Sequence, residues 1–485
     1  MFRSSLLAFN TLIFDKILLH KSVNQNIVAN IYLHTLSGHP VFLEKYSLSK
    51  KAKIWLSIRF KLILIIRILQ SIFDNKSYYS SKGNTKSDIL FVSHLTNNQQ
   101  LLKDSDEYFG DLSSQLLKYN IKSSVALINH IKVNTRQLLN SWKGDEITRF
   151  VLSSSLDFVS ELKLYFSQKK SKKQLRYILK DLQVDKALVK DILRYHLSSD
   201  TFNALRIAKQ VANIARKTGA KVIVTTYEGH AWERLVYYYV RKINPNIKCL
   251  GYQHAAVFKH QHAIRRPLSK NYNPDIILTS GLIAKYILEK SQLKDSEIFC
   301  LGSSKYLTPS IVKGKIQCCL VVPEGFVKES ISLFGFSLDY AKQHRNQKFI
   351  WRLHPMLSFE KLRRYSSIFE SLPDNIFFSE GSLDEDIQKC DSVLYRGSTA
   401  VVNAINAGLR PIYYQQSLDE LSIDPIYQQQ RGKEVVYSQK SLGLALDKDV
   451  DMKIKQSLQD FAQNFYTPID VKVLKSIFDK HTKRV

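Results

Sequence analysis

The stretch from residue 348 to residue 411 constrains the fold most strongly, because it contains two short apolar runs that each end abruptly in small or polar residues. The first run, FIWRL, is followed by His354 and Pro355, and the second, SVLY, is followed by RGST at residues 396–399. A mostly helical segment separates the two runs. Runs with such ends predict buried strands of a parallel sheet, with ligand-facing residues at its carboxyl edge.

The same alternation of apolar runs and helical segments occurs from ILFVSHL (89–95) to DIILTSG (275–281), and again from IQCCLVVP (316–323) to RPIYYQ (410–415). This pattern predicts an α/β protein with two doubly wound domains that face each other across a cleft. A chain of 485 residues is long enough for two such cores. The predicted parts are a basic helical N-terminal segment at 1–86, a first domain at 87–302 with a helical insertion at about 157–200, a second domain at 303–450, and C-terminal helices at 451–485 that cross back.

The charge balance indicates an anionic partner. The chain holds 71 Lys and Arg residues against 43 Asp and Glu, a formal net charge of +28. Nucleic acid, an anionic membrane surface and phosphorylated small molecules are the three candidates. The aromatic residues lie inside apolar strand and helix patterns and no nucleic-acid-binding motif is present, so nucleic acid is not expected as a partner. The five cysteines form no C-x-x-C pair, which predicts reduced thiols without disulfides or a zinc site.

The run IWLSIRFKLILIIRILQSIF, residues 54–73, is about as long as a membrane-spanning helix. Arg59, Lys61 and Arg67 interrupt it, however, and a spanning helix would have to hide all three charges. A spanning helix, a helix in the plane of an anionic membrane surface, and a helix packed on its own domain remain as alternatives.

Candidate ligand-binding residues follow the apolar runs of the second domain. His354 and Pro355 end one run, where the imidazole could donate a hydrogen bond to a phosphate. Gly397, Ser398 and Thr399 stand between a strand and a helix, where free backbone N–H groups favour an anion. Three further residues join this group of predicted nucleotide-binding positions: Arg352, Arg396 and Glu324. The alternatives are a structural turn and an ordinary capped helix.

In the first domain, Glu228, Gly229 and His230 follow the run KVIVTTY and precede a helix. A carboxylate at this position could serve as a general base for a hydroxyl group, and the glycine permits close approach of a substrate. The alternative is a glutamate that stabilises the first turn of the helix. Glu233, inside the helix, is the weaker candidate for the base.

Histidines also follow two neighbouring runs of the first domain. His254, His260 and His262 lie in GYQHAAVFKHQH (251–262) at the end of the next run, and His94 comes directly after ILFV with Ser93. No carboxylate accompanies the three clustered histidines and their spacing fits a loop, so a metal site is not expected. His254 is instead predicted to orient a substrate or to act as an acid or base. His94 is predicted to contact an acceptor, together with Gly229 and His230.

The order of these motifs resembles that of bacterial GT-B-fold glycosyltransferases of surface and capsular polysaccharide biosynthesis, of the polysialyltransferase and Kdo-transferase-like groups. Glu228-Gly229, His354-Pro355 and Ser398-Thr399 match the family's acidic-glycine, HP and Ser-Ser/Thr motifs over roughly residues 87–450. The chain departs from the pattern where Tyr227 replaces the first of two acidic residues, which leaves the donor sugar open. The resemblance implies two Rossmann-like domains.

The resemblance also implies a metal-independent transfer from a nucleotide-sugar donor, expected to be CMP-linked, to a glycan or glycolipid acceptor. Glu228 would take the proton of the acceptor hydroxyl, while Arg352, His354 and residues 398–399 would stabilise the departing phosphate. No cofactor beyond the nucleotide sugar is expected. The implied location is cytoplasmic, on the inner face of the membrane. Two alternatives stay open: a CDP-glycerol-type glycerophosphotransferase and a non-catalytic membrane-associated scaffold.

Overall fold

The structure is a computed structural model of the full chain. It describes residues 50–73, 76–82, 86–103, 105–131, 147–181, 193, 196–197, 199–259, 261, 264–265, 270–291, 293, 295–310, 317–355, 357–417, 422–449 and 451–482. Of the predicted N-terminal segment, residues 1–49 therefore lie outside the described part.

The first domain is built on a sheet that has eight strands within the described residues, in the order β1-β4-β3-β2-β5-β6-β7-β8. All neighbouring strands run parallel except the edge strand β1, which pairs antiparallel with β4. The strands are β1 (Tyr78–Ser80), β2 (Ile89–Leu95), β3 (Ser123–Asn129), β4 (Thr148–Leu152), β5 (Val222–Thr226), β6 (Lys248–Gln253), β7 (Ile276–Thr279) and β8 (Glu297–Cys300).

The second domain is built on a fully parallel sheet that has six strands in the described chain, in the order β11-β10-β9-β12-β13-β14. The strands are β9 (Cys318–Pro323), β10 (Lys348–Trp351), β11 (Ile376–Phe378), β12 (Ser392–Arg396), β13 (Arg410–Tyr414) and β14 (Glu434–Val436). In both sheets the strand order reverses direction once, between β2 and β5 and between β9 and β12. Such a switch point leaves a crevice at the carboxyl ends of the strands, where ligands of doubly wound domains bind.

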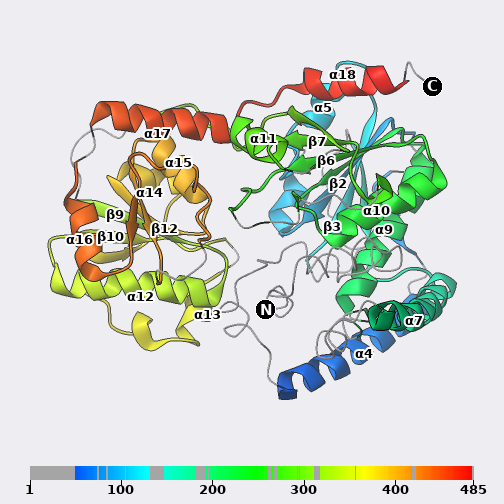
Figure 1. The fold of residues 1–485 in the computed structure, drawn as a ribbon, viewed down its shortest axis with the longest axis horizontal. Helices are drawn as coiled ribbons and strands as arrows, with labels where there is room; N and C mark the ends of the chain where they lie inside the picture. Colours follow the sequence, from blue (N-terminus) through cyan, green and yellow to red (C-terminus); the bar gives the residue numbers. More distant parts are fainter. Residues whose placement is uncertain are drawn as a thin grey trace.

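Helices cover both faces of each sheet (Figure 1). Those of the first domain are α4 (Lys50–Phe73), α5 (Leu112–Leu117), α7 (Phe158–Asp181), α9 (Ser199–Thr218), α10 (Ala231–Ile243) and α11 (Leu282–Glu289). Those that follow are α12 (Val327–Gln343), α13 (Phe359–Arg363), α14 (Leu383–Gln388), α15 (Ala400–Asn406), α16 (Gln439–Asp447), α17 (Met452–Phe465) and α18 (Val471–Thr482). Short 3₁₀ helices span Asn98–Leu102, Lys270–Tyr272 and Ser367–Phe369.

The end of the chain joins the two domains. Helix α17 packs on α15 of the second domain and reaches α11 of the first (Figure 1). Helix α18 then packs on the first domain, where Leu474, Ile477 and Phe478 join the core beside α5. Two doubly wound domains connected in this way form the GT-B architecture, so the predicted fold class is confirmed.

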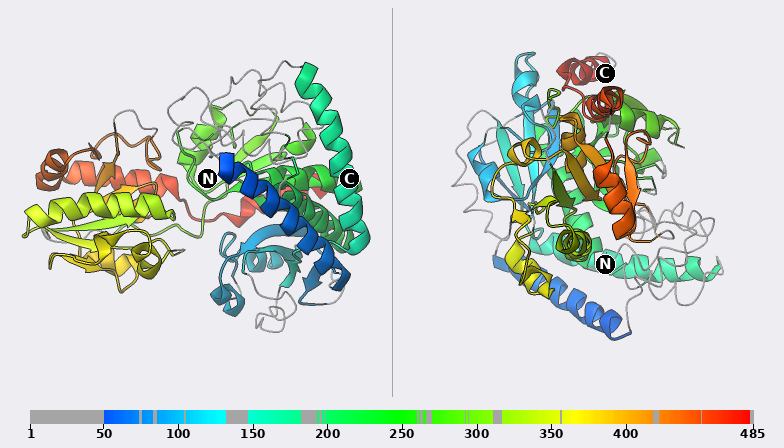
Figure 2. Two further views of the ribbon diagram at one scale, coloured as in Figure 1. Left: turned by 90° about the horizontal axis from the view of Figure 1, so that it is seen from below. Right: turned by 90° about the vertical axis from the view of Figure 1, so that its left-hand side faces the viewer.

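Helix α4 lies across the outside of the first domain, beside α7 (Figure 2). Its inner face contains the buried Phe60 and Ser71, and Leu64 packs against the core. Its outer face is apolar and exposed: Ile54, Trp55, Ile58, Leu62, Ile65, Ile66, Leu69, Ile72 and Phe73 all keep half or more of their surface in contact with solvent. Among the described helices, none has the length and apolarity to cross a bilayer.

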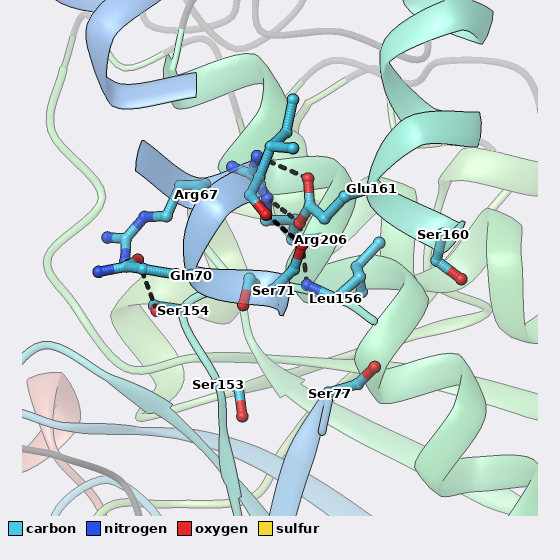
Figure 3. A network of polar contacts seen from close by, with 12 residues as sticks. Arg67, Gln70, Ser71, Ser77, Ser153, Ser154, Leu156, Ser160, Glu161 and Arg206 are labelled. Atoms are coloured by element: carbon cyan, nitrogen blue, oxygen red, sulfur yellow. Dashed lines mark hydrogen bonds and ion pairs between the residues drawn. The ribbon is translucent and has the colours of Figure 1, made fainter. Parts of the chain in front are cut away.

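A buried polar network lies beneath α4 and joins α7 to α9 (Figure 3). Glu161 of α7 accepts two hydrogen bonds from Arg206 of α9, at 2.6 and 2.9 Å, and one from the backbone N–H of Leu156 at 2.9 Å. Both charged side chains are almost fully buried, so the loss of one partner would cost about 3–5 kcal/mol of stability. On the α4 side, Gln70 accepts hydrogen bonds from Arg67 and from Ser154. The Glu161–Arg206 pair thus fixes the helical insertion to α9, and the bond from Ser154 to Gln70 connects α4 to the chain after β4.

Candidate functional site

The switch point of the first sheet brings His94 together with the residues that follow β5. His94 lies near the end of β2, and one of its ring nitrogens is 3.0 Å from the hydroxyl of Thr226, the last residue of β5. The other ring nitrogen is 2.9 Å from His130, which directly follows β3. Burial and the neighbouring imidazoles lower the pKa of His94 to about 3. His94 is therefore a neutral hydrogen-bonding group at neutral pH.

Glu228 lies in the loop between β5 and α10, not in the first turn of the helix. The helix begins after His230, its N-cap residue, and the buried Glu233 fills the capping position by accepting the backbone N–H groups of Glu228 and His230 at 2.7–3.1 Å. Burial raises the pKa of Glu233 to about 7. Glu233 thus has the structural role that was the alternative for Glu228. Gly229 has a φ of +84°, which lets the loop turn at this point.

Two histidines contact the Glu228 carboxylate. His254, just after β6, approaches one carboxylate oxygen to 3.5 Å, and His230 approaches the other to 3.3 Å. Burial lowers the pKa of His254 to about 4 even though the carboxylate acts in the opposite direction. His254 is therefore neutral at pH 7 and can hold Glu228 by a hydrogen bond, but it cannot supply a proton as an imidazolium.

Aromatic side chains complete this group, and sequence reasoning missed them. The Tyr108 ring packs edge-on against His254 at 4.7 Å between ring centres, and the Trp232 ring packs edge-on against His94 at 5.4 Å. Tyr108 lies in a turn that Asp106 stabilises by accepting the N–H groups of Tyr108 and Phe109. The sequence around 107–120 predicts a helix, but the described helix begins only at Leu112. His130 could have been found, because it too directly follows an apolar run.

A cavity of about 400 Å³ opens at the carboxyl edge of the second sheet. His354, Pro355, Ser398 and Thr399 line it, as the sequence predicts for a shared site. Further lining residues come from the ends of β9 and β10, from α14 and α15, and from the segments that connect the domains: Val322, Pro323, Arg352, Leu353, Leu383, Ala400, Asn403, Lys305, Leu307 and Tyr466.

The loop after β9 packs against this cavity at the switch point. A side-chain carbon at Gly325 would lie 3.1 Å from the imidazole of His354, and one at Gly397 would lie 2.7 Å from the carboxylate of Glu324. Gly397 also has a φ of +71°. Both observations therefore favour glycine at residue 397, and Gly325 leaves little room for a larger residue where the loops after β9, β10 and β12 meet. Burial, and next the nearby Lys305, lower the pKa of the half-buried His354.

The helix after β12 has no side-chain cap. Helix α15 begins at Ala400, and its N-cap residue Thr399 makes no capping hydrogen bond. The Ser398 hydroxyl accepts only a long bond, 3.4 Å, from the N–H of Ala400. The capping role that was the alternative for these hydroxyls is therefore largely unused, and both residues line the cavity.

The two predicted arginines differ from expectation. Arg396 is buried, pairs with Glu329 and donates to the carbonyl of Tyr414, so it does not line the cavity. Arg396 lies at the end of a strand, where a ligand-binding residue is expected. Its side chain, however, points to the face of the sheet that α12 covers, away from the cavity. Arg352 does line the cavity, yet its Nη1 already donates to Ser379, Gly381 and Asp386 at 2.7–2.8 Å. These hydrogen bonds hold the loop that follows β11 in place.

The two edges are close enough to interact. The positive charge of Lys305 contributes to lowering the pKa of His254 in the first domain and that of His354 in the second. Arg265 of the first domain also donates to the Tyr427 hydroxyl of the second at 3.0 Å. His260 and His262 lie outside the described residues. Within the part of the chain that is described, no cluster of three or more His, Cys, Asp or Glu side chains is arranged to hold a metal ion.

No protein-family model and no curated protein matches this sequence. Among solved structures, the chain is similar to a putative UDP-N-acetylglucosamine 2-epimerase from Listeria monocytogenes, with a TM-score of 0.47 and 13% identity over 82% of this chain and 98% of that one. It is also similar to MurG from Acinetobacter baumannii (TM-score 0.46, 8% identity, 81% and 99% covered) and to a glycosyltransferase from Rickettsia africae (0.46, 12%, 82% and 100%). These identities are too low to transfer an activity or a substrate.

Proposed function

We propose that this protein is a glycosyltransferase that moves a sugar from a nucleotide-activated donor to a hydroxyl group of a glycan or glycolipid acceptor. One observation carries the proposal. The switch points of both sheets hold side chains suited to one half of this reaction, a carboxylate with neutral imidazoles in the first domain and an open cavity lined by His354, Ser398 and Thr399 in the second. Lys305 lies within electrostatic reach of both edges.

In the first domain, Glu228 would act as the general base. Its carboxylate takes the proton of the acceptor hydroxyl as the oxygen attacks the anomeric carbon of the donor. His254 is a positioning residue for this step, because its neutral ring lies 3.5 Å from the carboxylate and competes with water for it. Tyr108, which packs on His254, and Trp232, which packs on His94, add aromatic rings to this edge, and such rings suit the C–H faces of a sugar.

In the second domain, the cavity would hold the nucleotide. As the bond between the anomeric carbon and the phosphate oxygen breaks, the electron pair stays on that oxygen. The His354 ring and the hydroxyls of Ser398 and Thr399 can donate hydrogen bonds to the departing phosphate. For the donor, we infer a CMP-linked acidic sugar of the sialic acid or Kdo type, on the basis of the sequence motifs at these positions.

Nucleotide binding tests this proposal directly. Purified protein is titrated with CMP, CDP, UDP and GDP, and the thermal midpoint is followed with the dissociation constant. CMP is expected to raise the midpoint most, because a ligand of the native state stabilises it by mass action. Binding of CDP without CMP would favour the glycerophosphotransferase alternative. If none of the four nucleotides binds, the transferase proposal is wrong.

We also propose that α4 attaches the enzyme to an anionic membrane surface, on the inner face of the cytoplasmic membrane. At 100° per residue, the exposed apolar residues of α4 fall within a stripe about 120° wide. Arg59 and Lys61 are exposed and border this stripe on its two sides. An apolar stripe flanked by cations is the pattern of helices that lie in the interface of anionic bilayers.

Vesicle flotation tests the role of α4. Replacing Ile58, Leu62 and Ile65 together by serine is expected to lower binding to phosphatidylglycerol vesicles more than about tenfold, because each buried apolar side chain contributes roughly 1.5–3 kcal/mol. The matched control replaces three apolar residues on the second-domain side that are more exposed than those of α4, Tyr365, Leu444 and Met452, by serine. Equal binding of both triple variants would exclude α4 as the anchor.

A further inference from the structure

The cavity of the second domain has a cation that comes from neither sheet. Lys305 belongs to the linker that runs from β8 to β9, and it lines the cavity together with His354 and Ser398. Its side chain is exposed, and its Nζ lies 5.9 Å from the centre of the Tyr466 ring. Across the described residues, no carboxylate pairs with Lys305. By contrast, the guanidinium of Arg352 is already bound by Asp386.

The backbone around Lys305 is held in a tight turn. The N–H of Lys305 donates to the Ser303 hydroxyl at 3.1 Å, and the N–H of Tyr306 donates to the Ser303 carbonyl at 3.1 Å. On the side toward the first domain, Gly302 has a φ of +90°, and a side-chain carbon there would lie 2.0 Å from the carbonyl oxygen of Pro468. The N–H of Ser303 also donates to the carbonyl of Thr467 at 2.8 Å.

The next residues of the linker are tied to the second domain. Asn406 of α15 donates its side-chain amide to the carbonyls of Leu307 and Thr308, and Gln459 of α17 donates to the carbonyl of Ser310 at 2.9 Å. Lys305 therefore lies where the linker passes from the contacts of one domain to those of the other. A ligand held by this side chain and by His354 would contact the linker and the second domain at once.

We propose that Lys305 is a phosphate ligand of the donor site, supplied by the linker between the domains. This proposal rests on the proposed transferase function. An ammonium group presented on a fixed turn, next to an imidazole and two hydroxyls in one cavity, matches the negative charge that the phosphate gains as the sugar leaves. The influence of Lys305 on the pKa of both His254 and His354 agrees with this central position.

The test compares three variants, Lys305→Gln, Lys305→Arg and the control Lys389→Gln. Lys389 is also an exposed lysine, but it precedes β12 and so lies at the amino edge of the sheet, away from the cavity. Each protein is titrated calorimetrically with CMP and cytidine and with UDP and uridine. Lys305→Gln is expected to weaken binding of the nucleotide about tenfold and to leave binding of its nucleoside unchanged, because a hydrogen bond to a charged group is lost. Lys305→Arg should restore most of the affinity, and Lys389→Gln should bind as the unmodified protein does.

The outcomes separate this proposal from the one on which it rests. If the unmodified protein binds CMP or UDP and Lys305→Gln binds the same nucleotide equally well, Lys305 is not a phosphate ligand, while the transferase proposal stands. An equal loss of nucleotide and nucleoside affinity in Lys305→Gln, with an unchanged circular dichroism spectrum, would also overturn the phosphate role. If the unmodified protein binds no nucleotide, both proposals fail.

Discussion

At the switch point of the first sheet the titratable side chains contact one another, whereas at the switch point of the second they surround an open cavity. His94 and His130 share a 2.9 Å contact, and Glu228 is held between His230 and His254. In the second domain the two glycines at 325 and 397 keep the loops close together and leave a cavity of about 400 Å³ beside them. The first edge is arranged to hold a proton acceptor in place, and the second to receive a ligand.

The contrast predicts that variants at the two edges affect different steps. The largest effect is expected for Glu228→Gln, which keeps the shape of the side chain but cannot accept a proton. Turnover should fall by a factor of about 10²–10⁴, the usual contribution of a general base, while the dissociation constant of CMP stays the same. Transfer assays with a CMP-linked donor and calorimetry measure the two quantities. Glu289→Gln, an exposed glutamate of α11, is the control. Full activity of Glu228→Gln would show that Glu228 is not the general base.

A pair of histidine variants sharpens the comparison further. His354→Ala is expected to weaken CMP binding about tenfold, because the ring lies at the cavity and loses a hydrogen bond to the phosphate. His254→Ala should bind CMP normally and lower turnover instead. Calorimetry gives the dissociation constant of CMP for each variant, and initial rates give the turnover of each. If both variants lose nucleotide affinity equally, the edges do not have separate roles.

Acid should lower the stability of the first domain, which holds three buried histidines. The pKa of His94 is lowered to about 3, and those of His196 and His254 to about 4, all from 6.5. The unfolded chain therefore binds more protons at these sites, so their stabilising effect is complete above pH 6.5 and is lost as the pH falls toward 4. Glu233, with its pKa raised from 4.5 to about 7, opposes this, because its contribution is present below pH 4.5 and is lost as the pH rises through 7.

Three histidines outweigh one glutamate between pH 6.5 and 4.5, so stability should fall with acidification in this range. Each histidine contributes about 1.4 kcal/mol per pH unit. Urea unfolding at pH 7.5, 6.0 and 5.0 measures the slope. His196 is buried and lies away from the edge. The His196→Gln variant should reduce the slope of the unfolding free energy against pH by about the contribution of one histidine. A slope that is unchanged in this variant would show that His196 is not held neutral in the folded state.

Sequence reasoning found the strands and their ends, because apolar runs followed by polar residues are local features. It therefore placed Glu228, His254, His354 and residues 397–399 just beyond the ends of strands, where the structure has them. It did not find which side of the sheet an end residue faces. Arg396 is the clearest example, since one residue of shift along a strand reverses the direction of a side chain, and Glu329 on α12 accepts it on the far side.

Residues brought in by loops and linkers were also beyond the sequence pattern. Tyr108 lies in a turn that Asp106 stabilises by a hydrogen bond. The composition of this segment is typical of a helix, so the sequence shows no sign of the turn. Lys305 and Tyr466 line the cavity because the linker and the returning chain are hydrogen-bonded to each other, a contact between segments more than 150 residues apart. Such long-range pairs leave no periodic signal in one sequence.

The smallest effect is expected for Arg352→Gln, and it tests whether charge at the second edge serves binding or structure. Arg352 Nη1 already donates to Ser379, to Gly381 and to the buried Asp386. Its removal should change the dissociation constant of CMP by less than about threefold, since the hydrogen bonds of that nitrogen are made within the protein and not to a ligand. The thermal midpoint should fall instead, because the carboxylate of Asp386 stays buried with one donor fewer. A tenfold loss of CMP affinity at an unchanged midpoint would mean that Arg352 exchanges Asp386 for the phosphate when the nucleotide binds, and the cavity would then have two cations where Lys305 alone is now proposed.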